Sequence, residues 1–331
     1  MSVALPHLVR RGVDAALEAT IVPSFSRIGI AVRQRLEDWQ PPPAGALEGE
    51  VVVITGATSG LGQATARVVG HLGASVELVG RDASKGSAAL AELSDAGVEA
   101  TFRSTDVGDT AAVGELADAL VAAHRRIHCV LHSAGGITKE RQTTPQGLEA
   151  TWASMVVGPR LLTRQLATDL VDGLGRAVWV TSGGMYLQDV DFDDIGWEER
   201  PWDGTRAYAQ AKRAQVDVVA EAAARGEAPL QVAVHPGWAN TPGVTDALPG
   251  FDKVMGPILR TPEEGADSLV WLVATPAEEI EPGALYHDRR VRGTVRWPGT
   301  GTSAVDRARL LRLVDEQAEV PRGKGRRSRR S

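Results

Sequence analysis

Short apolar runs alternate with alanine-rich stretches along most of the chain. Seven of these runs have the length and composition of buried strands, at residues 51–55, 75–79, 100–104, 127–133, 177–181, 231–235 and 284–286. The stretches between them, such as 110–125 and 147–170, have the length of helices. This alternation is typical of βαβ units, whose parallel sheet is covered by helices on both faces. We therefore expect one α/β domain with a doubly wound parallel sheet of about seven strands.

A separate helical pattern precedes the first predicted strand. Apolar residues recur at spacings of three or four, at Phe25, Ile28, Val32, Leu36 and Trp39, which predicts an amphipathic helix. Three prolines at 41–43 end it and begin a linker. The predicted organisation is a helical extension and linker at 1–47, the α/β domain at 48–290, and a C-terminal extension at 291–331 with a helix at 303–317. The apolar face of the N-terminal helix could cover its own domain, a second subunit or a bilayer, and we favour protein.

The charge of the chain is unevenly distributed. The net charge is −6, yet the last ten residues, 322–331, hold six of the 36 basic residues and none of the 42 acidic ones. The acidic remainder argues against a nucleic-acid-binding fold. We expect the basic tail to be a disordered, solubilising end, with contact to phosphate or a membrane as the alternative.

The cysteine count and the hydropathy pattern bear on the compartment. Cys129 is the one cysteine, so the chain forms no internal disulfide, and we expect a reducing compartment, the cytoplasm. The sequence contains no apolar run long enough to predict a spanning helix, and no secretory signal pattern at its N-terminus.

The first predicted strand leads directly into a glycine-rich turn. Gly56, Gly60 and Gly62 occupy this turn, and a predicted helix at 63–72 follows. Glycines at such a turn permit a sharp bend, a close approach of the backbone to a pyrophosphate, and tight packing of helix on strand. The free N–H groups at the start of the helix favour an anion. The stretch therefore predicts a dinucleotide site in a Rossmann-like domain, and the alternative is an ordinary strand–helix turn.

The end of the second predicted strand bears on the choice of dinucleotide. Arg81 follows Gly80 and could pair with the 2′-phosphate of NADP, whereas Asp82 could accept a hydrogen bond from the ribose of NAD. We favour NADP, and interpret Asp82 as the N-cap of the next helix. Asp106, after the third strand, is either an acceptor for the adenine amino group or another helix cap, and the sequence leaves both open.

Three further residues form a candidate catalytic set. Tyr208 and Lys212 are four positions apart in a predicted helix, so their side chains share one face. A free tyrosine has a pKa of about 10, and a neighbouring ammonium group favours the phenolate and lowers it. Ser182 follows the fifth predicted strand and could donate to a substrate oxygen as charge develops there.

These motifs, in this order, resemble the short-chain dehydrogenase/reductase family over about residues 48–290. The segment 55–62 is similar to the family's TGxxxGxG turn, and Tyr208 with Lys212 to its YxxxK motif. The resemblance implies an NADP-dependent oxidoreductase that transfers hydride between nicotinamide and a carbonyl or secondary alcohol. It further implies that Tyr208 is the acid/base, that Lys212 binds the nicotinamide ribose and lowers the tyrosine's pKa, and that Ser182 orients the carbonyl.

The resemblance also implies where the cofactor is bound. The expected cofactor-binding residues, with no metal, are Gly56, Thr58, Ser59, Gly60, Leu61, Gly62, Arg81, Asp106, Val107, Ser133, Ala134, Gly135, Tyr208, Lys212, Pro236, Gly237 and Thr241. Within the family, the runs 182–185 and 235–244 resemble the subgroup of dehydrogenase/reductase member 12.

Two motifs depart from the family pattern. His132 and Ser133 stand where the family has two asparagines, and Met155 stands where a helix asparagine helps to bind a proton-relay water. A methionine side chain is a poor hydrogen-bonding group, although the Met155 carbonyl or Ser154 could hold the water. Met155 motivates a second hypothesis, a dinucleotide-binding protein that senses redox state or scaffolds a partner with little turnover.

Two segments beside the catalytic set suggest the type of substrate. Acidic and aromatic residues fill 186–205, a candidate pocket wall, and 248–259 is an apolar run at the position of the family's substrate lid. Together they favour a hydrophobic small-molecule substrate. A third hypothesis, a peripheral membrane enzyme that modifies lipids, rests on the N-terminal helix and the basic tail. The family often forms dimers or tetramers, so a homo-oligomer is possible.

Overall fold

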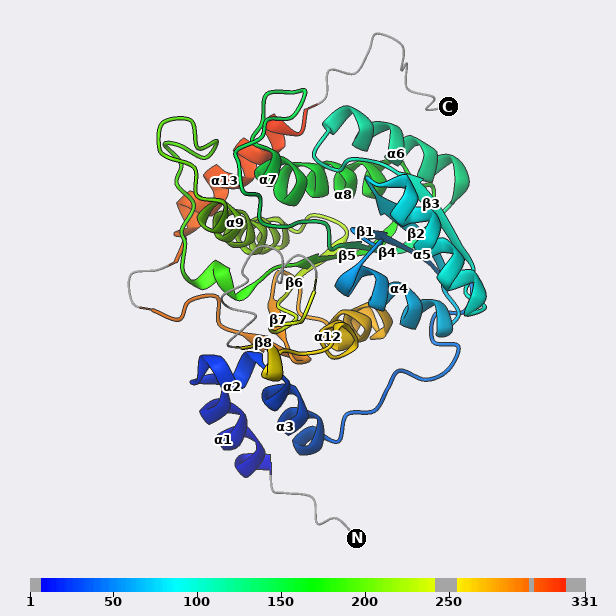
Figure 1. The fold of residues 1–331 in the computed structure, drawn as a ribbon, viewed down its shortest axis with the longest axis vertical. Coiled ribbons are helices and arrows are strands. Elements are labelled where there is room, and N and C mark those ends of the chain that lie inside the picture. The colour runs from blue at the N-terminus through cyan, green and yellow to red at the C-terminus, as the bar shows by residue number, and fades with distance from the viewer. Residues whose placement is uncertain (1–6, 242–254, 298–300, 320–331) are drawn as a thin grey trace.

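The protein is built on one twisted sheet covered by helices on both faces (Figure 1). A computed structural model describes residues 7–241, 255–297 and 301–319. The sheet has the strand order β3-β2-β1-β4-β5-β6-β7-β8. The strands are β1 (Val51–Thr55), β2 (Ser75–Gly80), β3 (Ala100–Ser104), β4 (Ile127–His132), β5 (Leu174–Val180), β6 (Leu230–Val234), β7 (Leu285–His287) and β8 (Arg290–Arg292). The predicted α/β class and doubly wound parallel sheet are confirmed.

The predicted number of strands was one too few. The eighth strand, β8, pairs antiparallel with β7 at the edge of the sheet. Its sequence, Arg-Val-Arg, is short and charged, so it carries none of the apolar signal by which the buried strands are recognised. The sheet therefore continues two residues past the predicted domain boundary at 290.

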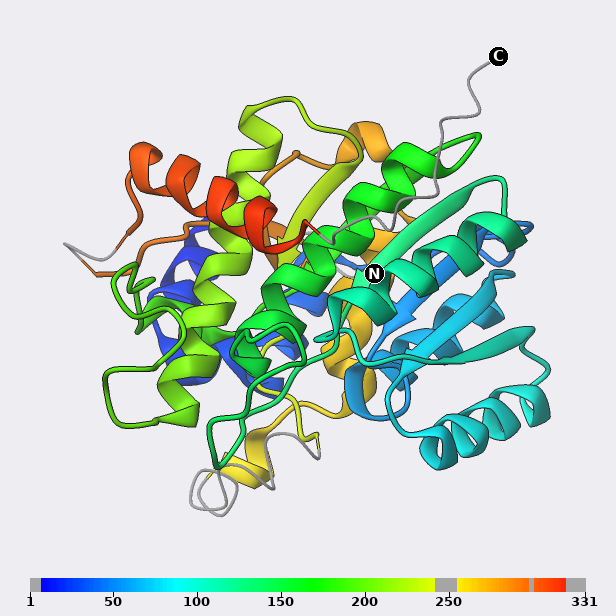
Figure 2. The ribbon, with the colours of Figure 1, turned by 90° about the horizontal axis from the view of Figure 1, so that it is seen from above.

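Two hydrophobic clusters occupy the two faces of the sheet. Successive residues of β1 alternate between them, since Val52 and Ile54 belong to one cluster and Val53 to the other. One face is covered by α4 (Gly60–His71), α5 (Ala83–Asp95) and α12 (Pro262–Ala274). The other is covered by α6 (Thr110–Ala123), α8 (Gly158–Asp169) and α9 (Gly204–Ala224). Figure 2 shows α13 (Ala304–Gln317) packed on α9 outside this second layer.

The predicted helix at 147–170 is interrupted. It consists of α7 (Ala150–Trp152), the π-helical turn η1 (Ala153–Val157) and α8. The Glu149 carboxylate caps α7 and accepts hydrogen bonds from two backbone N–H groups at 2.7 Å. A π turn is wider than an α turn and often marks a functional site; this one contains Met155.

The N-terminal extension is three helices, α1 (His7–Glu18), α2 (Ile21–Phe25) and α3 (Arg27–Glu37), packed beside β8 and α12 (Figure 1). The single predicted helix was wrong in two respects. The chain breaks at Ser26, whose hydroxyl caps α3. The buried face of α3 carries Gly29, Ile30 and Arg33, whereas Ile28 is 48% exposed. The side of α3 that is buried is the side that carries Arg33, because Arg33 forms ion pairs inside the protein. The spacing of apolar residues does not indicate these ion pairs.

The remaining elements are short. They are the 3₁₀ turns η2 (Gly183–Tyr186), η3 (Gly256–Ile258) and η4 (Ala277–Glu279). Residues 248–254 of the predicted lid and the basic tail at 322–331 lie outside the described residues.

Candidate active site

A cavity of about 1040 Å³ opens at the carboxyl ends of the parallel strands. Every residue predicted for the site lines it, from the glycine turn at Gly56 to Thr241. The sheet thus brings together segments that lie far apart in sequence. This is the location expected of a ligand site in a doubly wound fold.

The glycine turn lets the chain after β1 lie close against the chain after β4, where a side chain would not fit. Gly56 has a φ of +69°, and a Cβ there would lie 2.7 Å from the Ala134 Cα after β4. A Cβ on Gly62 would lie 2.4 Å from the Gly56 carbonyl oxygen. The helix α4 then begins at Gly60, and the Ser59 side chain makes no capping bond to it. This leaves backbone donors at the helix start for an anion, so the turn fits a dinucleotide pyrophosphate.

Charged residues surround the end of the cavity next to β2. The Arg81 Nη1 lies 3.6 Å from the Asp106 Oδ2, and both side chains are exposed. Asp82 caps α5, where its Oδ1 accepts from the Ser84 and Lys85 backbone N–H groups at 2.9 and 3.0 Å. The N-cap interpretation of Asp82 is therefore confirmed.

The alternative role considered for Asp106 was wrong, because Asp109 caps α6. Asp106 instead accepts a hydrogen bond from the Gly108 N–H at 2.9 Å and remains at the cavity wall. Sequence reasoning also missed Lys85, which lines the cavity. Its place in the first turn after the Asp82 cap is the signal that could have identified it.

The candidate catalytic residues meet where β5 ends against α9. Ser182 and Tyr208 line the same cavity, and Ser182 is near enough to the tyrosine to act on its pKa. Lys212 is buried, and its Nζ donates to the Val180 carbonyl oxygen at 2.6 Å. The Lys212 Nζ also lies 5.4 Å from the centre of the Tyr208 ring. The three side chains are therefore neighbours, as the motif spacing predicts.

The electrostatics of this group differ from the expectation. Burial lowers the pKa of Lys212 to about 7, so its ammonium form is disfavoured in the protein alone. Burial also raises the pKa of Tyr208, and the neighbouring Ser182 side chain opposes this rise only in part. The expected lowering of the tyrosine pKa is not found in the chain by itself, because the lysine is directed to Val180 and its own charge is destabilised.

Met155 has both its side chain and its carbonyl engaged. A Cβ on Gly135 would lie 2.7 Å from the Met155 Cε, so the thioether packs under the cavity wall. The Met155 carbonyl oxygen accepts a hydrogen bond from the Gln215 Nε2 at 2.8 Å. Gln215 lies three residues after Lys212, is 1% exposed, and has a buried Oε1 without a protein partner. Its spacing from Lys212 was a signal that sequence reasoning did not use.

The N-terminal extension forms part of the cavity wall. Ile21 and Phe25 of α2 line it together with Tyr186 and Trp238. The Trp238 N–H donates to the Phe25 carbonyl oxygen at 2.7 Å, and the two rings meet edge to face with centroids 5.6 Å apart. No signal in the sequence joins α2 to a segment more than 200 residues away, so this wall was not predicted.

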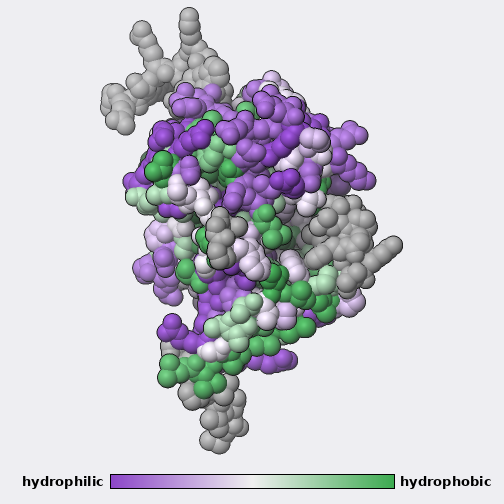
Figure 3. Space-filling view, turned by 90° about the vertical axis from the view of Figure 1, so that its left-hand side faces the viewer, coloured by the Kyte–Doolittle hydropathy of each residue, from purple (hydrophilic) through white to green (hydrophobic). Residues whose placement is uncertain are grey.

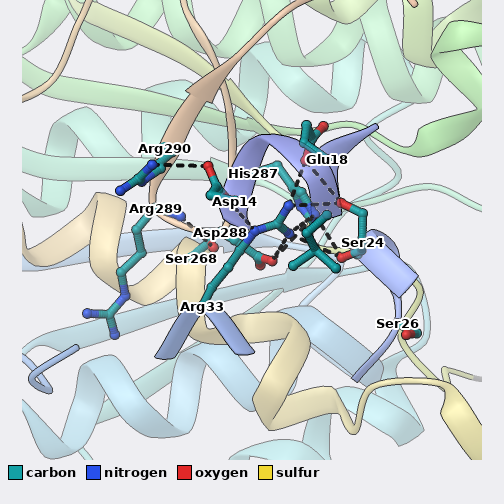
Figure 4. Close-up of polar contacts among 12 residues, drawn as sticks. Asp14, Glu18, Ser24, Ser26, Arg33, Ser268, His287, Asp288, Arg289 and Arg290 are labelled. Carbon is teal, nitrogen blue, oxygen red and sulfur yellow. Dashed lines mark hydrogen bonds and ion pairs between the residues drawn. The ribbon is translucent and has the colours of Figure 1, made fainter. Parts of the chain in front are cut away.

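A buried ionic network holds α2 and α3 in place (Figure 4). The Asp288 carboxylate accepts hydrogen bonds from Arg33 and Arg260, each with a shortest distance of 2.6 Å. All three side chains are buried. Arg260 also donates to the carbonyl oxygens of Ser24 and Pro236, both at 3.1 Å. Burial alone would raise the pKa of Asp288, but His287 and the two arginines hold it well below its usual range. One carboxylate thereby fixes the N-terminal helices beside the 236–241 segment.

The chain is similar in sequence and in fold to known proteins. The family described as short chain dehydrogenase matches residues 50–248. The human dehydrogenase/reductase SDR family member 12 is 33% identical over 83% of this chain and 88% of its own. Human retinol dehydrogenase 12 is 32% identical over 73% of this chain and 78% of its own. The fold is shared with a short chain dehydrogenase from Salmonella enterica, with a TM-score of 0.60, 22% identity, and coverage of 76% of this chain and all of the other.

Proposed function

Because the chain belongs to the short-chain dehydrogenase/reductase family, whose members are NAD(P)-dependent oxidoreductases acting on CH–OH groups, we propose that it interconverts an apolar carbonyl compound and its secondary alcohol with NADP. The observation that carries this proposal is the meeting of Ser182, Tyr208 and Lys212 in the same cavity as the glycine turn. A protein with only a structural role would not require these three side chains next to a glycine turn whose backbone N–H groups can bind phosphate.

The proposed chemistry assigns one task to each side chain. Bound cofactor supplies or accepts the hydride. The Ser182 hydroxyl donates a hydrogen bond to the substrate oxygen, where negative charge develops during reduction. The Tyr208 hydroxyl gives its proton to that oxygen as the alcohol forms, and takes it back in the oxidation direction. Lys212 stabilises the tyrosinate that remains, and binds the nicotinamide ribose.

Tyr208 must recover its proton after each reduction. We assign this supply to Lys212 and Gln215, because both are buried on the same side of α9. The Gln215 Oε1, a buried acceptor without a protein partner, can hold a water molecule. Gln215 would thus take over the function that the family gives to the asparagine replaced by Met155.

The preference for NADP is supported by the charges at the end of β2. Arg81 and Lys85 line the cavity there, and two cations suit a 2′-phosphate. Asp82, the residue that would favour NAD, has an oxygen committed to capping α5. The pairing of Arg81 with Asp106 at 3.6 Å is exposed and therefore weak, so it does not prevent Arg81 from binding phosphate.

An apolar substrate is supported by the part of the cavity wall that α2 forms with Tyr186 and Trp238. Ile21, Phe25, Tyr186 and Trp238 present largely hydrocarbon surface to the cavity. Transfer of an apolar group from water onto such a surface stabilises it by about 25 cal/mol per Å². The acidic residues of 186–205 contribute little to this wall. Asp191 and Asp194, for example, pair with Arg200, at 2.6 and 3.4 Å.

The experiment follows NADPH oxidation with a panel of aliphatic and aromatic aldehydes and ketones. For wild-type protein we expect turnover that increases with the size of the apolar group. Tyr208→Phe should lose about a hundredfold to ten-thousandfold in kcat while it still binds NADPH. Tyr286→Phe is the matched control, because Tyr286 lies outside the cavity. Undiminished turnover by Tyr208→Phe would refute the proposed role.

A second candidate is a redox-sensing or scaffolding protein with little turnover. The replacement of the family asparagine by Met155, whose carbonyl is already bonded to Gln215, favours it. This candidate predicts that NADPH binds and is not oxidised with any member of the panel. Steady turnover with one carbonyl compound excludes it.

A further inference from the structure

The first helix is inverted relative to an ordinary surface helix. Asp14 and Glu18 face inward, where Asp14 accepts from the Arg33 Nε at 2.8 Å and Glu18 from the Arg33 Nη2 at 2.7 Å. Leu8, Val9 and Val13 lie on the opposite side of the helix and are 81%, 45% and 38% exposed. A helix that only covers a protein core has its apolar face inward. In α1 the carboxylates face inward, with Asp14 buried and Glu18 partly buried, and the apolar side chains face solvent.

The apolar surface continues over the next two helices. Val22 of α2 and Ile28 of α3 are also exposed. Figure 3 shows apolar side chains gathered in a band over the end of the molecule that carries the N-terminal helices. We call Leu8, Val9, Val13, Val22 and Ile28 the outer apolar face.

This face borders the mouth of the cavity. Ile21, the neighbour of Val22, lines the cavity, as do Leu187 and Trp297, which are 75% and 48% exposed. The outer apolar face and the apolar wall of the pocket are therefore connected through α2.

Cationic groups flank the outer apolar face. Arg11 and Arg35 are exposed, and Arg27 is half-exposed with a loose contact of 3.7 Å to Glu264. The acidic groups of the same helices are engaged from within, Asp14 and Glu18 by Arg33, and Glu37 by the Arg290 Nη2 at 2.6 Å. The exposed charged groups of these helices are Arg11, Arg27 and Arg35, against one exposed carboxylate, Asp38 at the C-cap of α3. The charge presented around the apolar side chains is therefore mainly positive, which suits anionic headgroups.

We propose that the outer apolar face docks the protein on an anionic lipid bilayer. Among the described residues no helix is long and apolar enough to cross a membrane, so the helices would lie in the interface with Leu8, Val9 and Val13 inserted. A second copy of the chain is a poorer occupant, because a symmetric contact would bring the arginines of the two copies together. The docking does not depend on the proposed oxidoreductase activity. If both hold, an apolar substrate can pass from the bilayer into the cavity along α2.

The test is flotation of full-length protein with vesicles of phosphatidylcholine containing a minority of phosphatidylglycerol. Wild-type protein should float at low salt, and less with phosphatidylcholine alone. The double variant Leu8→Glu/Val13→Glu should lose at least about tenfold in vesicle partition. Both side chains are exposed, so the variant should keep its thermal unfolding temperature and NADPH binding. Val171→Glu, which alters an equally exposed apolar residue between α8 and β5, is the matched control and should float like wild type.

Two flotation results would overturn the proposal. One is failure of wild-type protein to float with the anionic vesicles. The other is equal flotation of Leu8→Glu/Val13→Glu and wild type. Sedimentation velocity without lipid tests whether a second copy of the chain covers the outer apolar face instead. If wild type is a dimer and Leu8→Glu/Val13→Glu is a monomer, the face is a subunit interface, and this result would also overturn the proposal. NADPH binding and turnover are measured on the same samples, so a failure of docking is distinguished from a failure of the proposed activity.

Discussion

The Lys212 ammonium nitrogen lies 5.4 Å from the centre of the Tyr208 ring, while its hydrogen bond goes to the Val180 carbonyl oxygen at 2.6 Å. The lysine is therefore positioned beside the tyrosine but is held in a dry environment that disfavours its charge. Burial lowers the pKa of Lys212 to about 7 in the folded protein, against about 10.4 in an unfolded chain. This difference links the candidate site to the stability of the whole domain.

The linkage predicts the pH dependence of unfolding for cofactor-free protein. Between about pH 7 and pH 10 the unfolded state holds a proton on Lys212 that the folded state lacks, so this group makes the free energy of unfolding rise with pH. The penalty for the buried charge is fully present below pH 7 and amounts to about 5 kcal/mol.

Lys212→Met removes this titration. Its advantage in stability over wild type should therefore be largest below pH 7 and decline as pH rises to about 10. Denaturant unfolding at several pH values measures the difference, and exposed Lys85→Met serves as the control. A constant difference between Lys212→Met and wild type across this range would contradict the account.

If Arg81 binds the 2′-phosphate, it determines the preference for NADPH over NADH. Arg81→Ala should weaken NADPH binding by about ten- to a hundredfold and leave NADH binding nearly unchanged. Calorimetric titration with both nucleotides measures the two affinities. Arg125→Ala is the matched control, because Arg125 is equally exposed and pairs with Asp172 far from the cavity. An equal loss of affinity for NADPH and NADH would assign Arg81 a role unrelated to the phosphate.

Phe25 tests whether the N-terminal extension belongs to the substrate pocket. Phe25→Leu keeps an apolar side chain but removes ring surface, so KM for apolar carbonyl compounds should rise several-fold more than kcat falls. NADPH affinity should be unchanged. Val22→Ala alters the same helix on its exposed side and should leave both constants alone. If Phe25→Leu changes neither KM nor kcat, α2 does not contact the substrate.

Asp288 should be a strong determinant of stability. Asp288→Asn leaves Arg33 and Arg260 buried with less compensating charge, and breaking a buried pair in this way costs about 3–5 kcal/mol. Asparagine tolerates the left-handed backbone at this position, where φ is +52°, so the loss should come from charge. Asp172→Asn, which breaks an exposed pair with Arg125, should cost less than about 1 kcal/mol. Similar unfolding temperatures for the two variants would show that the network contributes little.

The sequence predicted the part of the fold that depends on local patterns. The buried strands and the residues at their ends follow from apolar runs and turn glycines, and parallel strands bring those ends to one edge. Gly56, Ser182 and Tyr208 therefore line one cavity as expected. The cap at Asp82 was predictable for the same reason, because its hydrogen bonds are local.

The features that were missed depend on contacts between distant segments. Ile28 belongs to an apolar spacing but faces solvent, because the opposite side of α3 is drawn inward by the pairing of Arg33 with Asp288. Phe25 is held at the cavity by distant residues, because Arg260 donates to the Ser24 carbonyl oxygen and the Trp238 N–H to the Phe25 carbonyl oxygen. The carbonyl partner of Gln215 depends on a π turn that helical periodicity does not predict. Buried ion pairs of this kind leave no periodic trace in a sequence.

The central claim is that this protein transfers hydride to a carbonyl carbon with Tyr208 as the proton donor. Its most direct test supplies NADPH deuterated at both C4 positions of the nicotinamide, with 2-decanone as an apolar probe, and examines the secondary alcohol by mass spectrometry. The account predicts one deuterium on the carbinol carbon with wild-type protein, and a rate of labelled product at least about a hundredfold lower with Tyr208→Phe. Unlabelled alcohol, or labelled alcohol formed equally fast by Tyr208→Phe, would contradict it.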